Sequence, residues 1–206
     1  MSEPDYWKSA IIDLSNSDCI LSKIIFDNPD VFLVSRGDPF FTLVRSIVGQ
    51  QISVRSASAI WSRLEGRLHE VTPSLVLQAG RDILRECGIT RQKSTYIYML
   101  AESFESGKIK PEIWDNQDDE SIIKELTLYR GIGRWTAEMF LIFYLARPDI
   151  LPMSDLGLRR AITELYSKKN ILDDNDILLI ADKWRPWRSV ATWYLWRFLD
   201  PEPVEY

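Results

Sequence analysis

The stretch Leu128–Phe140, LYRGIGRWTAEMF, decides the fold, because it places two glycines one residue apart between two helix-like segments. Glycine allows positive φ angles and leaves neighbouring backbone N–H groups uncovered. A helix that begins directly after Gly133 presents free amides at the positive end of its dipole, and such a turn can bind a phosphate. An ordinary helical hairpin with a glycine C-cap would also account for Gly131 and Gly133. The motif alone leaves both interpretations open.

The composition is that of a chain that can fold around a hydrophobic core, since 46% of its 206 residues are hydrophobic. This length suits one domain, or one domain in two lobes. The formal net charge of −5 argues against a protein that coats nucleic acid, but not against one that grips a few phosphates. The two cysteines are too few for a disulfide framework or a cysteine-ligated iron–sulfur cluster. No apolar run reaches the roughly 18 residues of a membrane span, so we expect no membrane partner.

Helical patterns run through almost the whole chain, and no run of strand length alternates between apolar and polar residues. Ser53 can cap a helix that begins at Val54, and Pro148 closes an apolar helical segment. We therefore predict an all-α fold. The expected helices are Pro39–Gly49, Val54–Leu68, Pro73–Ala79, Asp82–Cys87, Arg91–Ser106, Asp119–Leu128, Arg134–Leu145, Leu156–Tyr166, Asn175–Lys183 and Ser189–Leu199.

The hairpin belongs to a longer stretch, LYRGIGRWTAEMFLIFYLARPDILPMSDLGLRRAI (Leu128–Ile162). This stretch resembles the helix-hairpin-helix, Gly/Pro-rich loop and aspartate signature of the DNA glycosylase superfamily, and within it the 3-methyladenine DNA glycosylase II family. Three more segments agree in order: SIVGQQISVRSASAI (Ser46–Ile60), GITRQKSTYIYMLAE (Gly88–Glu102) and KWRPWRSVATWYLW (Lys183–Trp196). The resemblance covers about residues 39–199. It implies a two-lobed helical domain with a cleft between the lobes. Residues 1–206 are then expected to form a single glycosylase domain without an added N-terminal β domain.

Asp155 stands where a new helix is expected to begin. Its simplest role is that of helix N-cap, which Ser154 could fill as well. By the resemblance, Asp155 is the catalytic aspartate. Breaking an N-glycosidic bond builds positive charge on the deoxyribose, and a fixed carboxylate stabilises that transition state. The same carboxylate can orient or deprotonate the attacking water.

The resemblance also assigns aromatic residues to a base pocket. A base inside duplex DNA must flip out to be reached, and aromatic faces stabilise the cation of an alkylated purine. Trp135 and Trp196 match pocket positions, and Tyr144 is a further candidate, with core packing as the alternative role. Relatives with lyase activity carry a lysine at the Trp135 position. Because tryptophan cannot form a Schiff base, we expect water to be the nucleophile and an abasic site to be the product.

The loop Gln50, Gln51 and Ile52 matches the one that fills the gap left by the flipped nucleotide, although a polar turn between helices would have a similar composition. At the hairpin, the resemblance implies DNA contacts from Gly131, Gly133, Arg134 and Thr136. No cofactor is expected to be required. Family hairpins can hold a structural Na⁺ or K⁺ ion with backbone carbonyls, which by register would be those of Thr127, Tyr129 and Ile132.

The leading functional hypothesis is therefore a monofunctional glycosylase of base excision repair that removes purines of the 3-methyladenine and 7-methylguanine type. Two alternatives remain: a glycosylase for a neutral lesion such as hypoxanthine, and a non-enzymatic hairpin module that only binds DNA. The expected partner is double-stranded DNA with damaged bases, and the expected state is a monomer. The expected location is the cytoplasm (nucleoid) in a bacterium or archaeon and the nucleus in a eukaryote.

Overall fold

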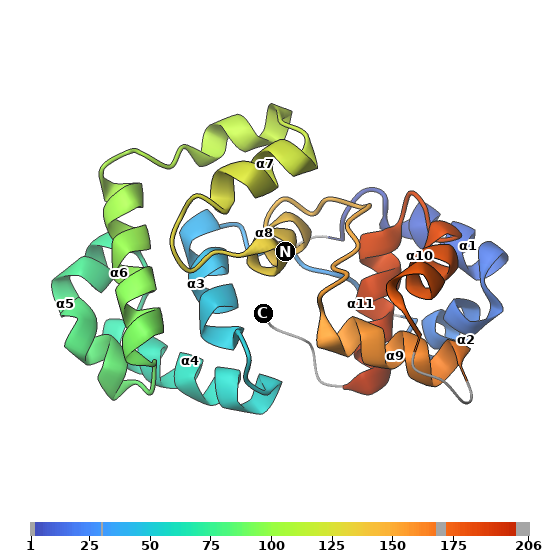
Figure 1. Cartoon of the computed structure of the whole chain (residues 1–206), viewed down its shortest axis with the longest axis horizontal. Helices are drawn as coiled ribbons and strands as arrows, with labels where there is room; N and C mark the ends of the chain where they lie inside the picture. The colour runs from blue at the N-terminus through green and yellow to red at the C-terminus, as the bar shows by residue number, and fades with distance from the viewer. Residues whose placement is uncertain (1–2, 30, 168–171, 201–206) are drawn as a thin grey trace. The chain divides into compact units, whose positions relative to one another are not determined.

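The structure is a computed structural model, and it describes residues 3–29, 31–167 and 172–200. Within these ranges all regular secondary structure is helical, with eleven α-helices and one 3-10 helix (Figure 1). The prediction of an all-α fold is confirmed. The chain divides into two compact units, one made of Met1–Ser35 with Leu141–Val204 and the other of Arg36–Phe140. The cleft that the resemblance implies stays a prediction.

Helix α3 (Pro39–Gly49) is the central helix of the unit Arg36–Phe140. It begins after Asp38, whose side chain accepts a hydrogen bond from the Phe41 amide at 2.6 Å. Nearly all of α3 is buried, and its buried residues include the polar Thr42, Arg45 and Ser46 beside apolar ones. It packs against α4 (Val54–Leu68) and α6 (Arg91–Glu105) of the same unit. Helix α5 (Pro73–Glu86) packs along α6.

The chain then leads through the 3-10 helix η1 (Pro111–Asn116) and α7 (Asp119–Leu126) to the hairpin and α8 (Arg134–Phe143). Trp114 of η1 is fully buried and contacts the Phe140 ring edge-on, with 5.0 Å between ring centroids. This contact joins η1 to α8. Helix α8 continues from one unit into the other, since the division falls between Phe140 and Leu141.

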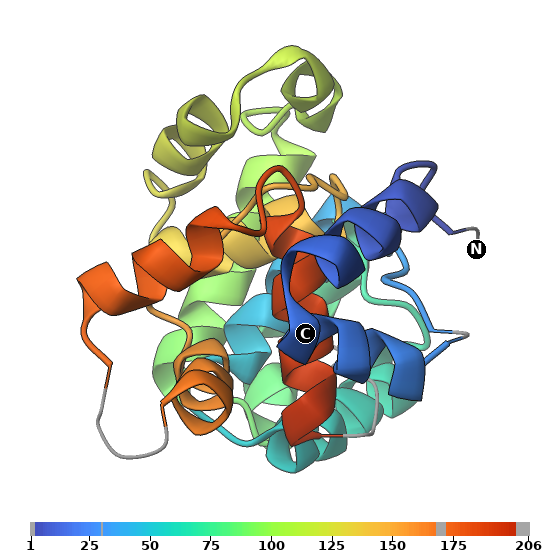
Figure 2. The same cartoon turned by 90° about the vertical axis from the view of Figure 1, so that its right-hand side faces the viewer.

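Helix α11 (Arg188–Leu199) is the central helix of the other unit, and Ser189–Trp196 is buried without interruption. It packs against α1 (Trp7–Ser17), α2 (Cys19–Asp27) and α9 (Leu156–Tyr166). Figure 2 shows α11 between the blue helices α1 and α2 and the orange helices α9 and α10 (Asp174–Asp182). A helix enclosed in this way is a rigid support for the loops that touch it.

Three predicted helices, α3, α4 and α9, have the observed bounds. The segments predicted as Pro73–Ala79 and Asp82–Cys87 are joined in α5, which kinks at Gly80 with φ 75° and ψ 170°. The remaining predicted helices differ from the structure by one or two residues at one or both ends, while α1, α2 and η1 lie outside the predicted set. Among the described residues, every helix is too short or too polar to span a bilayer.

Candidate functional site

The hairpin between α7 and α8 is held from below by Ile132, which is buried and whose amide donates to the Tyr129 carbonyl at 3.1 Å. Only one of the two glycines uses the left-handed region: Gly131 has a φ of 93°, and a Cβ there would overlap the Tyr96 side chain of α6. Gly133 does not have a positive φ, and a Cβ there would have no atom of the described chain within 4 Å. The fold therefore requires glycine at 131 but not at 133.

The loop after α3 is braced against this hairpin. The Gln50 side-chain amide donates to the Gly131 carbonyl at 2.9 Å and to the Thr136 hydroxyl at 2.8 Å. From α6, the Lys93 ammonium donates to the carbonyls of Val48 at 2.9 Å and Gln50 at 2.7 Å. Burial lowers the pKa of Lys93. Three predicted DNA-binding residues are thus brought together, although Gln50 and the buried Thr136 hydroxyl are engaged with each other.

The other two residues of the predicted gap-filling loop differ in their exposure to solvent. Gln51 is exposed and has a φ of 58°, which is uncommon for a residue other than glycine. Ile52 is half-buried, and its amide donates to the Gly49 carbonyl at 3.4 Å. Strained backbone tends to cluster at functional sites, and Gln51 is the one residue of this loop that is both strained and exposed.

Arg134, predicted to contact DNA, is already paired in the structure. Its guanidinium donates to Glu120 of α7 through two nitrogens and to Glu138 at 2.9 Å. The hydrogen bonds to Glu120 raise the pKa of Arg134, and the same contact lowers the pKa of Glu120. A phosphate contact from this side chain would require exchange of the Glu120 partner.

Asp155 caps α9, as its position predicted. Its Oδ1 atom accepts the Leu158 amide at 2.6 Å, and the same oxygen accepts the Trp196 indole N–H at 2.8 Å. Asp155 is 6% exposed and Trp196 is 3% exposed, so the contact is shielded from water. The Trp196 ring also stacks on Phe143, with 5.9 Å between centroids and 11° between planes. Capping and a further role are therefore compatible, because two donors fix the carboxylate.

The other predicted pocket residues occupy different surroundings. Trp135 is the second residue of α8 and is half-buried. Tyr144 is half-buried directly beyond α8, and its carbonyl accepts the Ser35 hydroxyl at 2.9 Å. Trp196 and Asp155 are brought together within one unit, whereas Trp135 belongs to the unit Arg36–Phe140.

The proposed cation ligands lie around the turn, where Thr127 is the C-cap of α7 and the Tyr129 carbonyl accepts the Ile132 amide. A carbonyl oxygen has two lone pairs, so that bond leaves one for a cation. Among the described residues, no group of three or more histidine, cysteine, aspartate or glutamate side chains could hold a metal. Any ion at the hairpin would depend on backbone oxygens.

Three residues that contact the site were not singled out from sequence: Lys93 and Tyr96 lie against the hairpin and its loop, and Gly157 lies against Asp155 and Trp196. A glycine two residues after a capping aspartate is a usable signal for Gly157. Lys93 and Tyr96 act through contacts with residues distant in sequence, and such contacts leave no local pattern.

Comparisons with known proteins point to one family. Residues 44–187 match the family model described as HhH-GPD superfamily base excision DNA repair protein. The chain is 32% identical over 168 residues to DNA-3-methyladenine glycosylase 1 of Schizosaccharomyces pombe. The aligned residues cover 80% of this chain and 74% of the relative.

Two solved structures are also similar. A Schizosaccharomyces pombe 3-methyladenine DNA glycosylase in complex with abasic DNA has a TM-score of 0.82 at 30% identity, covering 92% of this chain and 95% of the other. A DNA-3-methyladenine glycosidase from Bacillus halodurans has a TM-score of 0.76 at 31% identity, covering 100% and 97%. The chain therefore belongs to the HhH-GPD superfamily of base excision DNA repair proteins, in its 3-methyladenine DNA glycosylase family.

Proposed function

We propose that this protein is a monofunctional DNA glycosylase that excises alkylated purines of the 3-methyladenine and 7-methylguanine type from double-stranded DNA. The names of its relatives support the reaction class and the alkylated substrate. The observation that carries the proposal is the Asp155 carboxylate, which the Leu158 amide and the Trp196 indole hold at the start of α9.

In the proposed reaction, the bond between C1′ of the deoxyribose and the purine nitrogen breaks, and the base leaves with the bonding electron pair. The alkyl group makes the base cationic before cleavage, so it departs as a neutral molecule. Asp155 stabilises the positive charge that develops on the sugar. It also orients a water molecule, whose oxygen forms the new bond to C1′ and whose proton is lost to the carboxylate or to solvent. The product is an abasic site with its phosphates intact.

Trp135 supports water as the nucleophile. An enzyme that also cleaves the strand uses an amine to form a Schiff base with the sugar, and tryptophan has no such amine. Trp135 would instead contribute an aromatic face to the cationic base. Trp196, in the other unit, would act as a hydrogen-bond donor that holds Asp155.

DNA binding is proposed to use the hairpin and the Gln51 loop. The first-turn amides of α8, at Arg134 and beyond, offer a phosphate a site that carries no net charge. Gly133 is exposed with open space where a side chain would stand, which leaves room for the DNA backbone. Gln51 would fill the gap left by the flipped nucleotide and hydrogen-bond the orphaned base. We propose that Thr127, Tyr129 and Ile132 offer carbonyls to a monovalent cation, that no other cofactor is needed, and that the monomer is active.

The test of the proposed function is release of bases from methylated duplex DNA by the wild type and by Asp155→Asn, with the freed bases identified. Asparagine keeps the Oδ1 acceptor for Leu158 and Trp196, so the fold and DNA binding are expected to persist. We expect the single-turnover rate to fall by about 100-fold or more, because the charge that stabilises the transition state is removed.

Ser154→Ala is the matched control, since Ser154 is the exposed neighbour of Asp155 and should be replaceable without loss of rate. Duplexes containing hypoxanthine test the neutral-lesion alternative, and borohydride in the reaction should trap no covalent adduct between protein and DNA. Wild-type activity in Asp155→Asn would remove the aspartate from the mechanism. A trapped adduct would refute the monofunctional assignment.

A further inference from the structure

The loop between α8 and α9 contains the residues Tyr144–Ser154 and ends at Asp155. It has no helix or strand of its own. A loop of this length keeps a single conformation only through its contacts with the rest of the protein. The position of the Asp155 carboxylate therefore depends on what the loop is bound to.

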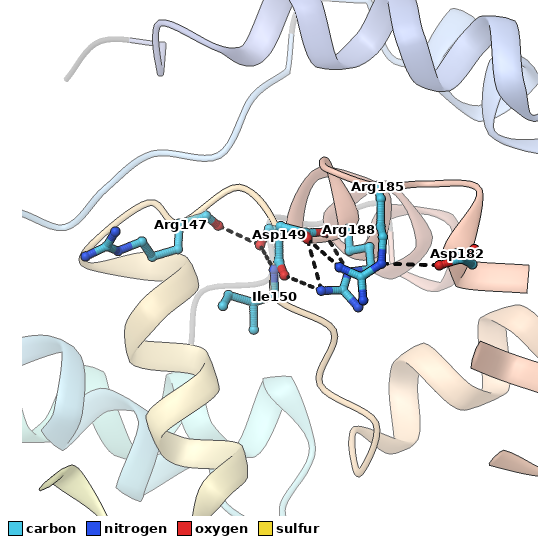
Figure 3. Close-up of polar contacts among 7 residues, drawn as sticks. Arg147, Asp149, Ile150, Asp182, Arg185 and Arg188 are labelled. Carbon is cyan, nitrogen blue, oxygen red and sulfur yellow. Dashed lines mark hydrogen bonds and ion pairs between the residues drawn. The ribbon is translucent and has the colours of Figure 1, made fainter. Parts of the chain in front are cut away.

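The first anchor is an ion pair between the loop and the first residue of α11. Arg188 donates from Nε to Asp149 Oδ1 at 2.6 Å and from Nη2 to Asp149 Oδ2 at 3.0 Å (Figure 3). The same Nη2 also donates to the Asp149 backbone carbonyl at 2.9 Å. The side chains are 16% and 25% exposed. A bidentate, shielded pair of this kind is stronger and more directional than an ordinary surface ion pair.

The second anchor is Ser189, the next residue of α11, which is 2% exposed. Its hydroxyl donates to the Arg147 carbonyl at 2.6 Å and accepts the Ile150 amide at 2.9 Å. Its own amide donates to the Pro148 carbonyl at 2.9 Å. One serine thus satisfies backbone groups on both sides of Asp149, and removing its hydroxyl would leave two of them without that partner.

The same helix holds the far end of the loop. Trp196 follows Ser189 by seven residues, which places both on one face of α11, and its indole donates to Asp155. The two attachment points are about 11 Å apart along the helix, at 1.5 Å per residue. Because α11 is the buried central helix of its unit, it gives the loop two fixed points on one rigid element.

We propose that Asp149, Arg188 and Ser189 are positioning residues that set the place of the Asp155 carboxylate by fixing the start of its loop on α11. The catalytic consequence rests on the proposed function, since a carboxylate misplaced by about 1 Å can cost about 100-fold in rate. Loosening the anchor should therefore slow base release while leaving the affinity for DNA almost unchanged.

The chain offers a matched control at the same carboxylate. Arg185 donates to Asp149 Oδ2 at 2.9 Å and to Asp182 Oδ1 at 3.2 Å, but its side chain is 52% exposed. Exposed ion pairs of this kind contribute little. Arg188→Gln and Arg185→Gln therefore remove the same charge beside the same acid, and only the first removes the bidentate anchor.

The experiment measures three quantities on the full chain: the single-turnover rate of base release from methylated DNA, the Kd for abasic-site DNA, and the indole N–H resonance of Trp196. The chain has eight tryptophans, and Trp196→Phe identifies the resonance in a ¹H–¹⁵N spectrum. The resonance reports the hydrogen bond to Asp155 directly.

In Arg188→Gln we expect the Trp196 resonance to shift and the rate of base release to fall about tenfold or more, while the Kd stays within about twofold of the wild type. Arg185→Gln should leave the rate and the Kd within about twofold of the wild type and the Trp196 resonance unshifted. Arg188→Lys should recover part of the rate, because the charge remains while the bidentate geometry is lost.

An unshifted Trp196 resonance and a wild-type rate in Arg188→Gln would overturn the inference, as would equal losses in Arg185→Gln. If Arg188→Gln does not fold, Ser189→Ala makes the same test from the second anchor. If the wild type releases no base at all, the proposed function fails, while the resonance still shows whether the anchor places Asp155.

Discussion

Gly157, the second residue of α9, lies against both members of the Asp155–Trp196 contact. A Cβ there would be 3.2 Å from Asp155 Oδ1 and 3.4 Å from Trp196 Cδ1. Such distances are tight, so the carboxylate or the indole would have to move by a few tenths of an ångström. The need for glycine at this position is thus set by the side chains that Gly157 faces, and not by its backbone angles.

Gly157→Ala should separate stability from catalysis. Alanine in a helix is favoured over glycine by up to about 1 kcal/mol, which offsets the cost of the tight contact. We therefore expect a Tm at or near that of the wild type and a single-turnover rate of base release reduced about tenfold. Gly66→Ala in α4 is the control, because a Cβ at Gly66 would have no atom of the described chain within 4 Å. A wild-type rate in Gly157→Ala would show that the carboxylate tolerates this displacement.

At the scale of the element, the two glycines of the hairpin are expected at their positions for different physical reasons: Gly131 for the fold and Gly133 for DNA binding. Gly131→Ala should destabilise the protein by about 1–3 kcal/mol, because φ is positive and the new Cβ would overlap Tyr96. Gly133→Ala should leave the free energy of unfolding within about 0.5 kcal/mol. The measurement for both is urea unfolding, followed by the Kd for abasic-site DNA.

The second glycine is expected to matter only when DNA is present. A methyl group at Gly133 would stand where the proposed phosphate approaches the first amides of α8, so affinity should fall although stability does not. Unchanged affinity in Gly133→Ala would argue that the hairpin does not contact the DNA backbone. Equal loss of stability in both variants would contradict the conformational distinction between the two glycines.

How far the sequence predicts these elements depends on their end signals. Helices α3, α4 and α9 begin after Asp38, Ser53 and Asp155. Each of these residues is the N-cap, and its side chain accepts a backbone N–H of the first turn. Helix α1 has no side-chain cap hydrogen bond, no acid in its first turn and no base in its last turn, so its ends carry no local signal. Propensity alone marks such a helix weakly, and packing against α2 and α11 stabilises it.

The site divides in the same way. Asp155 is marked by its capping position and by the resemblance, and both are properties of a short stretch. The pairing of Gln50 with Thr136, and of Arg134 with Glu120, joins residues 86 and 14 positions apart. Contacts of that kind follow from how helices pack, and no periodicity within one helix specifies them. The sequence therefore offers candidate site residues, but it does not predict what each side chain bonds to.

At the scale of the whole molecule, a net charge of −5 has to be reconciled with DNA binding. Many arginines of the described residues are already matched by acids, which reduces the positive charge available to phosphates. The paired arginines are Arg67, Arg85, Arg134, Arg159, Arg160, Arg185 and Arg188. Backbone amides at the start of α8 can bind a phosphate without adding charge, so the grip need not depend on a basic surface.

This charge distribution predicts a weak salt dependence. Each phosphate neutralised by a lysine or arginine releases counterions and adds about −0.9 to the slope of log K against log salt. With an amide-based grip and these seven arginines paired with acids, we expect a slope no steeper than about −4. The measurement is the Kd for abasic-site DNA by fluorescence anisotropy at several KCl concentrations.

Arg134→Gln distinguishes two bound states. If Arg134 leaves Glu120 for a phosphate in the complex, the slope of the variant becomes shallower by about one. If the ion pair with Glu120 persists, the slope does not change. A wild-type slope near −8 would mean that a basic surface, and not the hairpin amides, supplies most of the binding.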